Sequence, residues 1–390
     1  MQKKVYLCKR KTKARWIMTQ LKTLPIGIQE FEKIRKGDYL YIDKTELIYN
    51  MIKGGSYYFL SRPRRFGKSL LMSTIHAIFN GKRELFDGLA IADKTDMDWA
   101  KHPVLHLDLN TNKYNAKEVL EKKLDESLSV WEKEYDCERK DLPFGMRFEN
   151  IIQHAYDKTG KGVVILVDEY DKPMLQAITN EELQNEFRGT LKGFYGALKS
   201  KDGCIKFALL TGVTKFGKVS VFSDLNNLRD ISMSEQYTSI CGITEEELKS
   251  MMLPYVERMA TANNTTTDEC LAKLKEQYDG YHFCEDTAGM YNPFSILNAF
   301  TENKFRSYWF ETGTPTYLAE LLLKHKYNLH KMATCQTTTK ILDSIDPNST
   351  SPIPVIYQSG YLTIKDYDHV FKLYTLGFPN QEVEEGFIDF

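Results

Sequence analysis

Short apolar runs alternate with longer amphipathic stretches through the first two thirds of the chain. One run, residues 163–167, has no polar alternation, as expected for a strand covered on both faces. Between the runs, apolar residues recur every three or four positions, which is typical of amphipathic helices. This alternation predicts an α/β fold over roughly residues 40–242, with a parallel sheet between two layers of helices. The predicted strands are 57–60, 104–109, 163–167, 205–210 and a weaker fifth at 237–241; two helices are marked by Leu71, Ile75 and Ile78 and by Leu120, Leu124, Leu128, Trp131 and Tyr135.

After residue 242 the pattern changes to helices followed by a hairpin. Residues 244–247 form a capping box that opens a helix, and Asn292-Pro293 and the Gly-Thr-Pro at 313–315 punctuate further helices. Two strand-like runs flank a polar turn at 366–368, which predicts a β-hairpin. We therefore expect a basic, disordered head at 1–23, an α/β domain at 24–242 and a helical or winged-helix-like lid at 243–390. The two runs of the hairpin are 361–364 and 371–374.

Composition excludes several classes of protein. With 42% hydrophobic and 12% aromatic residues, the chain can bury a large core, which argues against disorder, collagen and coiled coil. No apolar run approaches the ~20 residues of a membrane-spanning helix. The 7 cysteines are odd in number and lack C-x-x-C spacing, which favours reduced thiols in a cytoplasmic protein. Neither Cys nor His residues follow a zinc-binding pattern.

The charge is unevenly placed along the chain. Residues 1–17 hold seven basic side chains and no acidic one, so 45 of the 52 basic residues remain against all 53 acidic ones, a net charge of −8 for the rest. A mildly acidic body is a poor general clamp for nucleic acid, because neutralising phosphates requires clustered Lys and Arg. The head fits a disordered tail or an upstream mis-start before Met18; a nucleic-acid arm and a targeting segment are the alternatives.

A candidate phosphate-binding loop directly follows the first predicted strand. Residues 61–69 are Ser-Arg-Pro-Arg-Arg-Phe-Gly-Lys-Ser, which end as the pattern G-x-x-x-x-G-K-[ST] ends but carry Arg62 in its first glycine position. Gly67 would let the backbone approach a phosphate, Lys68 would reach the β- and γ-phosphates, and Ser69 would hold Mg²⁺. The tripeptide alone is weak evidence, and a surface turn is the alternative; its place between a strand and a helix favours the phosphate site.

Polar residues end the third and fourth predicted strands. Asp168 and Glu169 follow the third strand, at the edge where open α/β sheets bind ligands. Asp168 would orient Mg²⁺ and Glu169 would act as general base on the attacking water, with a solvated turn as the alternative. Thr211, at the end of the fourth strand, would sense the γ-phosphate or simply cap the strand.

Arginines add further candidates. Arg64 and Arg65 would pair with phosphate oxygens, or act on the nucleotide of a neighbouring copy, unless they are plain surface arginines. Arg188 is a weaker candidate for an arginine finger, and residues 43–45 are typical of a helix cap. The predicted nucleotide contacts are Arg62, Pro63, Arg64, Arg65, Phe66, Gly67, Lys68, Ser69, Leu70 and Asp168. The predicted catalytic residues are Glu169, Lys68, Arg65 and Thr211, and the predicted metal ligands are Ser69 and Asp168.

These motifs together resemble the bacterial AAA-ATPase-like family. The resemblance implies a P-loop NTPase core with a mainly parallel five-stranded sheet, a winged-helix-like lid, and ATP and Mg²⁺ as ligands. In this family an arginine at the position of Arg62 is usual, and a PD-(D/E)xK nuclease-like domain commonly follows. This chain ends about where that domain would begin, so we expect no nuclease activity from it. The motifs that carry the resemblance are residues 24–28, 41–45, 61–69, 167–173, 211–213, 278–281, 291–295, 312–315, 360–363 and 377–380.

Three functions fit the sequence. The first is an ATP-hydrolysing switch whose lid moves with nucleotide state and regulates a nuclease-like or other protein partner. The second is a nucleotide-binding scaffold with little turnover; a Glu169 one water away from the γ-phosphate favours the first function, and a salt-bridged Glu169 the second. The third is a DNA-binding regulator. Its candidate contacts are Lys324, Lys326, Lys331 and Lys340, which Glu382, Glu384, Glu385 and Asp389 offset. An arginine acting on a neighbouring copy would require a homo-oligomer.

Overall fold

The computed structural model describes residues 21–216, 227–311, 316–325, 335–342, 345 and 351–388. Some features predicted from the sequence lie outside these residues, namely positions 1–20 of the basic head and the punctuation at 313–315. The same holds for Lys326, Lys331 and Asp389 and for the side chains of Lys324 and Lys340.

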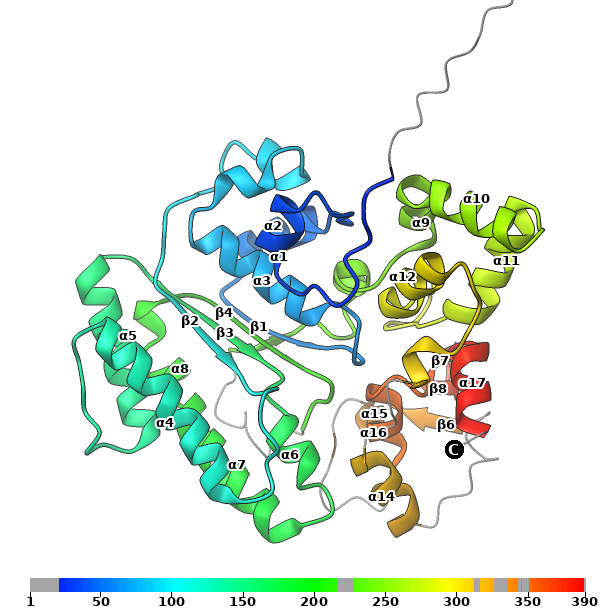
Figure 1. The fold of residues 1–390 in the computed structure, drawn as a ribbon. Coiled ribbons are helices and arrows are strands. Elements are labelled where there is room, and N and C mark those ends of the chain that lie inside the picture. The colour runs from blue at the N-terminus through cyan, green and yellow to red at the C-terminus, as the bar shows by residue number, and fades with distance from the viewer. Residues whose placement is uncertain are drawn as a thin grey trace, which may run out of the picture.

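A five-stranded parallel sheet forms the centre of the first half of the chain. Its strand order is β2-β3-β4-β1-β5, so the predicted α/β fold with a parallel five-stranded sheet is confirmed (Figure 1). All six residues of β3 are buried, as its unbroken apolar run predicts. The strands are β1 (Tyr57–Ser61), β2 (Val104–Asp108), β3 (Val163–Asp168), β4 (Ile205–Gly212) and β5 (Arg229–Asp230).

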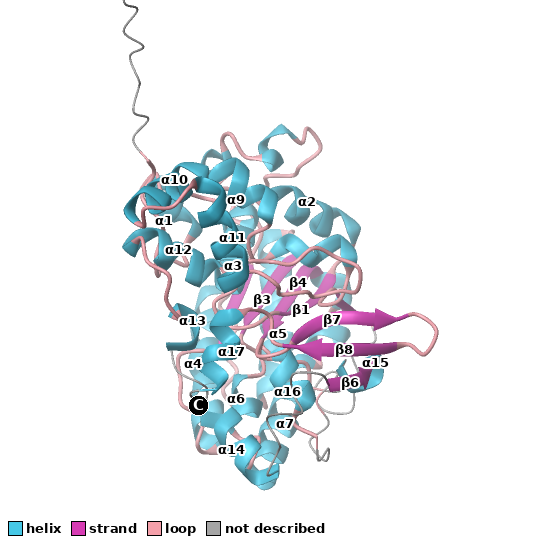
Figure 2. Ribbon diagram, turned by 90° about the vertical axis from the view of Figure 1, so that its right-hand side faces the viewer, coloured by secondary structure: helices cyan, strands magenta, loops and turns pink. Residues whose placement is uncertain are grey.

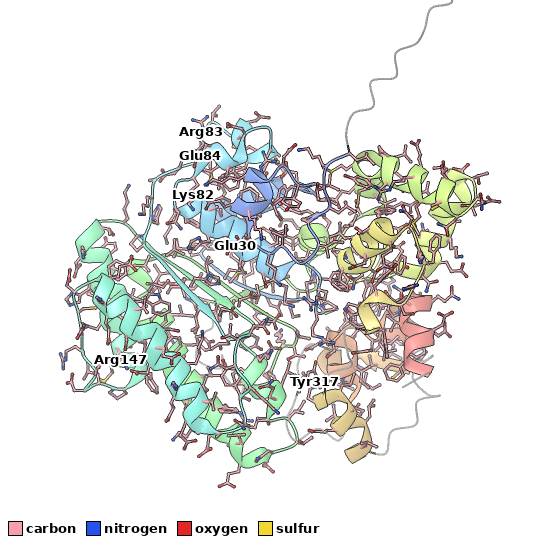
Figure 3. The ribbon with its side chains drawn as sticks, in the orientation of Figure 1. Glu30, Lys82, Arg83, Glu84, Arg147 and Tyr317 are labelled. Atoms are coloured by element: carbon pink, nitrogen blue, oxygen red, sulfur yellow. The ribbon has the colours of Figure 1, made fainter. Side chains whose placement is uncertain are left out.

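Helices cover both faces of this sheet. Figure 1 shows α1, α2 and α3 on one face and α4, α5, α7 and α8 on the other. The helices are α1 (Phe31–Lys36), α2 (Thr45–Gly54), α3 (Lys68–Phe79), α4 (Lys117–Glu134), α5 (Phe144–Thr159), α6 (Lys172–Gln176), α7 (Glu181–Tyr195) and α8 (Ala197–Ser200). The predicted apolar stripes of α3 and α4 are buried against the sheet and its helical layer. On the outer layer, Arg147 of α5 pairs with Asp125 and Glu132 of α4 at 2.6 and 2.8 Å (Figure 3).

The fifth strand was predicted at the wrong place. Residues 237–240 lie in the 3-10 helix Glu235–Ile240, and the fifth strand is the pair Arg229–Asp230 beside β1. Tyr237 and Ile240 are both buried, three positions apart, which is the spacing of a helical turn rather than of a strand. Two polar residues at a sheet edge carry no periodic signal, so β5 could not be identified from the sequence.

The second half of the chain is mainly helical and contains a small antiparallel sheet. The predicted capping box is confirmed, since Thr244 N donates to Glu247 Oε2 at 2.8 Å and Glu247 N donates to Thr244 Oγ1 at 3.1 Å. Three strands in the order β6-β8-β7 form this sheet, with α15 and α16 between β6 and β7 and α17 after β8. The elements are α9 (Glu245–Met251), α10 (Leu253–Ala262), α11 (Thr267–Tyr278), α12 (Pro293–Glu302), α13 (Tyr308–Glu311), α14 (Thr316–His325), β6 (Cys335–Thr338), α15 (Thr339–Leu342), α16 (Ile353–Gln358), β7 (Thr363–Asp368), β8 (Leu373–Gly377) and α17 (Gln381–Ile388).

The predicted hairpin is present as β7 and β8, but its turn was predicted too early. Residues 366–368 continue β7, and the chain reverses after them because Asp368 Oδ1 accepts the N–H groups of Val370 and Phe371 at 2.8 and 2.9 Å. Figure 2 shows this hairpin projecting from the body. At its tip, 83% of Val370 and 73% of Phe371 are exposed.

The N-terminal segment links the two halves. Leu40 is buried in the hydrophobic cluster formed by α9 to α12, with Leu24 and Ile42 packed against the same cluster. Lys44, just before α2, pairs with Glu247 of α9 at 2.5 Å. The boundary at residue 242 therefore stays a prediction, because residues on both sides of it share one core.

A close approach of two loops lets the fold be tested by substitution. Gly360 has φ of +90°, and a Cβ there would lie 2.6 Å from Pro63 Cβ. We expect Gly360→Ala to lower the free energy of unfolding by about 1–3 kcal/mol more than a glycine substitution that only strains the backbone. Gly160→Ala is the matched control, since Gly160 has φ of +62° with nothing within 4 Å of the added carbon. Equal losses in urea unfolding would contradict this packing.

Candidate phosphate-binding site

The loop between β1 and α3 has the backbone of an anion-binding turn. Gly67 has φ of +96°, and the helix α3 begins at the next residue, so the first N–H groups of the helix are free to bind an anion. A Cβ added at Gly67 would meet no atom within 4 Å, so the space beside this glycine is open. Arg65 also has a left-handed backbone, with φ of +66°. This backbone resembles that of loops that bind a phosphate at a helix N-terminus.

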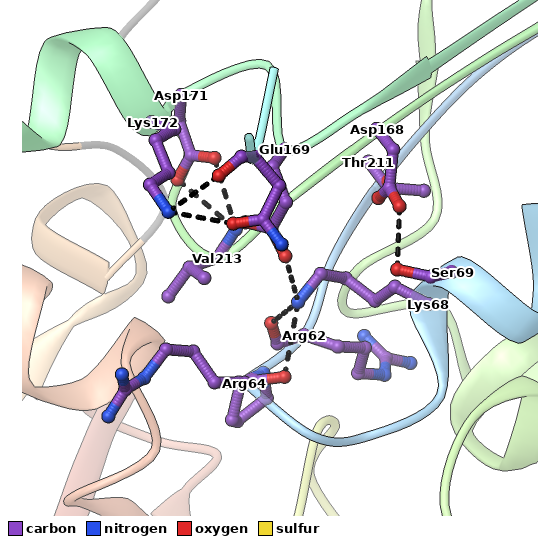
Figure 4. Close-up of polar contacts among 12 residues, drawn as sticks. Arg62, Arg64, Lys68, Ser69, Asp168, Glu169, Asp171, Lys172, Thr211 and Val213 are labelled. Carbon is purple, nitrogen blue, oxygen red and sulfur yellow. Dashed lines mark hydrogen bonds and ion pairs between the residues drawn. The ribbon is translucent and has the colours of Figure 1, made fainter. Parts of the chain in front are cut away.

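Lys68 lies folded over this loop. Its Nζ donates to the carbonyl oxygens of Arg62 and Pro63 at 3.0 and 3.2 Å and pairs with Glu169 Oε1 at 3.1 Å (Figure 4). The side chain of Lys68 is only 3% exposed and that of Glu169 is 14% exposed. A buried ammonium at the mouth of the loop attracts anions strongly, because little water screens it.

Ser69, Asp168 and Thr211 meet at the carboxyl ends of β3 and β4. Ser69 Oγ donates to Asp168 Oδ2 at 2.6 Å, and Thr211 Oγ1 donates to Asp168 Oδ1 at 2.6 Å (Figure 4). A hydroxyl and a carboxylate side by side are oxygen ligands of the kind that Mg²⁺ prefers, with phosphates and waters completing its shell. Among the residues that the structure describes, no group of three His, Cys, Asp or Glu side chains could hold a metal ion by protein ligands alone. The donor set thus fits a magnesium ion that arrives with a phosphate.

A buried carboxylate that the sequence analysis did not single out fixes the turn carrying Glu169. Glu169 has φ of +54°, a left-handed backbone. Asp171 Oδ2 accepts from Val213 N at 3.1 Å and from Thr214 N and Oγ1 at 2.6 Å each. Burial, and after it the nearby Glu169, raise the pKa of Asp171 to about 7. In the sequence, Asp171 is marked only by its position two residues beyond Glu169. That position does not reveal its hydrogen bond to Val213, 42 residues away.

Arg62 is oriented away from the phosphate side. Its guanidinium donates to the carbonyl oxygens of Ser61, Ser232 and Tyr237 at 2.9, 2.7 and 3.1 Å and stacks on Phe283 at 4.0 Å. The residue is 1% exposed, and this burial lowers its pKa to about 10. Arg62 stands in the first glycine position of the motif, and its side chain connects the start of the loop to Ser232, Tyr237 and Phe283. Its carbonyl oxygen accepts a hydrogen bond from Lys68.

The other predicted loop residues are spread over several environments. Figure 4 shows the Arg64 side chain directed away from Lys68. Arg65 is exposed and lies over the ring of Phe294 at 5.2 Å. Phe66 is buried, and Leu70 is half-buried on α3. Most side chains of residues 62–67 thus contact other parts of the chain, and contact between this loop and a nucleotide stays a prediction.

Two weaker candidates lie outside this group. Asp43 Oδ1 accepts from Thr45 N and Oγ1 at 2.8 and 2.7 Å, a local turn just before α2, whose N-cap residue Lys44 makes no side-chain cap bond. Arg188 of α7 donates to Asn185 Oδ1 at 2.7 Å, within its own helix.

None of the described helices combines the length and the apolar character needed to cross a membrane.

Comparison with known proteins gives a family for this chain. Residues 25–222, which contain the whole site, match the AAA-ATPase-like family model, described as predicted AAA-ATPase. The chain is 39% identical over 367 residues to an uncharacterized protein in the vnfD 5′ region of Azotobacter chroococcum mcd 1. That match covers 93% of this chain and 68% of the relative.

A distant likeness to a solved structure was also found. The Aeropyrum pernix ORC2 protein, solved as ADPNP–ADP complexes, is similar at 9% identity and a TM-score of 0.29, over 89% of this chain and 92% of that one. At this score the likeness is too distant to support an argument about function. The family match and the relative, which span the phosphate loop and both strand ends, lead to one conclusion: this chain belongs to the AAA-ATPase-like family of predicted ATPases.

Proposed function

We propose that this protein binds ATP with Mg²⁺ at the loop between β1 and α3 and hydrolyses it to drive a conformational switch. The observation that carries the proposal is the convergence of four groups at one sheet edge, namely the ammonium of Lys68, the Ser69–Asp168 pair and the carboxylate of Glu169. An ammonium and helix N–H groups bind phosphate, and a neighbouring carboxylate can orient water.

Each group has a distinct task in this proposal. Lys68 and the first N–H groups of α3 hold the phosphates, while Ser69 and Asp168 hold the magnesium ion, which neutralises phosphate charge. Glu169 accepts the proton of the attacking water, and Thr211, bonded to Asp168, fixes the orientation of that carboxylate. Arg65, exposed at the loop, is the candidate for contact with a γ-phosphate or with a neighbouring copy.

The ion pair between Lys68 and Glu169 supplies the switch. A phosphate bound at the loop competes with Glu169 for the ammonium at 3.1 Å, because both are anions and Lys68 is their shared partner. Release of Glu169 from Lys68 on nucleotide binding would free it to meet water. The two arrangements differ in affinity for nucleotide, which is what a nucleotide switch requires.

The same ion pair favours the second candidate function. A salt-bridged Glu169 is the feature that the sequence analysis associated with binding without turnover, and Glu169 is salt-bridged in this structure. If the pair persists after nucleotide binds, the protein is a scaffold whose bound nucleotide holds the two halves together. Turnover therefore distinguishes the two functions, whereas binding does not.

The partner of the switch is also a proposal. The order α14, β6, α15, α16, β7, β8 supports a winged-helix-like module, whose projecting hairpin tip bears the exposed Val370 and Phe371. Apolar side chains at a tip where Asp368 offsets the single lysine, Lys372, suit a protein partner, for example a nuclease, better than DNA. The proposal also includes that this protein forms a homo-oligomer and acts in the cytoplasm.

The deciding experiment measures binding and turnover separately on the unmodified chain. We expect titration calorimetry to detect ATP binding that EDTA weakens, and a phosphate-release assay to detect Mg²⁺-dependent hydrolysis. Binding without phosphate release would exclude the hydrolysing switch and support the nucleotide-binding scaffold. If the chain binds neither ATP nor GTP, both the switch and the scaffold are refuted. Adding candidate DNA at several salt concentrations to the same assay tests the third function.

A further inference from the structure

The outer side of the phosphate loop is covered by the second half of the chain. A loop that turns its N–H groups toward a phosphate turns carbonyl groups outward, and these need donors. Trp309 Nε1 of α13 donates to the carbonyl oxygen of Arg64 at 3.0 Å, and Gly242 N donates to that of Phe66 at 3.2 Å. Both donors come from beyond the fourth strand, so the shape of the loop depends on residues remote in sequence.

Trp309 is itself held firmly. Its backbone N–H donates to Glu382 Oε1 at 2.6 Å, and Glu382 Oε2 accepts from Ser295 Oγ at 2.7 Å. Glu382 of α17 is fully buried, so breaking either bond carries a large desolvation cost. The indole ring packs against Tyr361 with ring centres 5.0 Å apart. The donor therefore has one fixed position relative to α12, α13 and α17.

Neighbouring loop residues are packed from the same side. Gly360 lies against Pro63, and Phe66 meets the rings of Tyr281 and Phe283 edge to face at 4.8 and 5.4 Å. Tyr317, labelled in Figure 3, has its hydroxyl 3.1 Å from Oγ of Ser359, the residue before Gly360. Apolar packing sets the distance of the loop from the second half, and the indole N–H bonds directly to the Arg64 carbonyl.

We propose that Trp309 is a positioning residue for nucleotide binding, which fixes the phosphate loop through the Arg64 carbonyl and couples it to α17 through Glu382. The role rests on the proposed function, since it concerns the same loop. With the carbonyl held outward, the N–H groups of the loop face the phosphate before it arrives. Movement of α13 or α17, for instance on binding a partner, would release this carbonyl and weaken nucleotide binding.

The test is Trp309→Phe, which keeps an aromatic ring but removes the N–H donor. We expect affinity for MgATP in calorimetry to fall about fivefold, the effect of one net hydrogen bond. The matched control is Trp131→Phe: Trp131 is likewise buried and stacks on Phe148, in α4. Both variants should lose thermal stability, but only Trp309→Phe should lose affinity. Nucleotide should also change tryptophan fluorescence in the unmodified chain and in Trp131→Phe, and not in Trp309→Phe.

A second variant guards against a failure to fold. Glu382→Gln keeps the shape and one acceptor oxygen, and we expect a smaller loss of affinity in the same direction. If the unmodified chain binds no nucleotide, the proposed function fails and the role of Trp309 fails with it. If that chain binds MgATP and Trp309→Phe binds it equally well, only the positioning role is overturned.

Discussion

Replacing Lys68 by alanine is expected to weaken MgATP binding by about a hundredfold. The Nζ of this lysine lies over the loop, 3.0 Å from the Arg62 carbonyl, where phosphate oxygens would replace Glu169 as its partner. A hydrogen bond to a charged group contributes about 1.5–3 kcal/mol, and ~1.4 kcal/mol is a factor of ten in affinity. Calorimetric titration of the variant against the unmodified chain measures the loss directly.

Lys172→Ala is the control for this prediction. Lys172 begins α6 close to the same sheet edge, but its Nζ donates to the carbonyl and side-chain oxygens of Asn110 at 3.1 and 2.7 Å rather than to the loop. Its removal takes away the same charge and should change affinity less than about threefold, since solvent screens it. Equal losses from both variants would mean that general charge attracts the nucleotide, and retained binding by Lys68→Ala would place the phosphates elsewhere.

Replacing Glu169 by glutamine should abolish turnover and preserve binding. A general base contributes about 10²–10⁴ to a rate, and the amide cannot accept the proton of water at neutral pH. The amide also carries no charge to compete for Lys68, so affinity for MgATP should stay the same or increase. Phosphate release under saturating ATP, together with calorimetry, separates these two effects.

The matched control for this substitution is Glu84→Gln. Glu84 is exposed on the 3-10 helix Arg83–Phe86, on the upper rim of the molecule in Figure 3, away from the sheet edge that carries the site. The Glu84→Gln variant should hydrolyse ATP at the rate of the unmodified chain. Normal turnover in Glu169→Gln would exclude this carboxylate as the base, while reduced binding in that variant would mean that its charge stabilises the loop rather than opposing the phosphate.

Much of the fold follows from local pattern, because β1 to β4 are apolar runs flanked by helical spacing. The parts that were missed are those in which tertiary contacts outweigh pattern. β5 holds only Arg229 and Asp230, which pair in register with Tyr58 and Phe59 of β1, and the Arg229 guanidinium lies over the Tyr58 ring at 6.0 Å. The hairpin turn was displaced because Asp368, which looks like part of a polar turn, closes the strand by accepting two N–H groups.

The candidate site divides in a similar way. Lys68, Ser69 and Asp168 follow a known spacing after predicted strands, so their convergence could be expected from sequence. The orientation of the Arg62 side chain away from Lys68 could not be expected from sequence, since its acceptors include carbonyl oxygens 170 and 175 residues away. Trp309 was equally hidden, 245 residues from the carbonyl that it binds. Contacts of this kind have no period or motif, and only the folded chain reveals them.

The N-terminal segment has a consequence for how this protein can be divided. Leu40 is buried among α9 to α12, and Lys44 joins α9, although both residues precede β1. A polypeptide that starts after residue 44 would leave an apolar face of that helical cluster exposed to water, and one that ends at residue 242 would leave Leu40 without its partners. Fragments cut at residue 242 are therefore candidates for split-protein complementation, in which each piece becomes soluble and ordered only when the other is present.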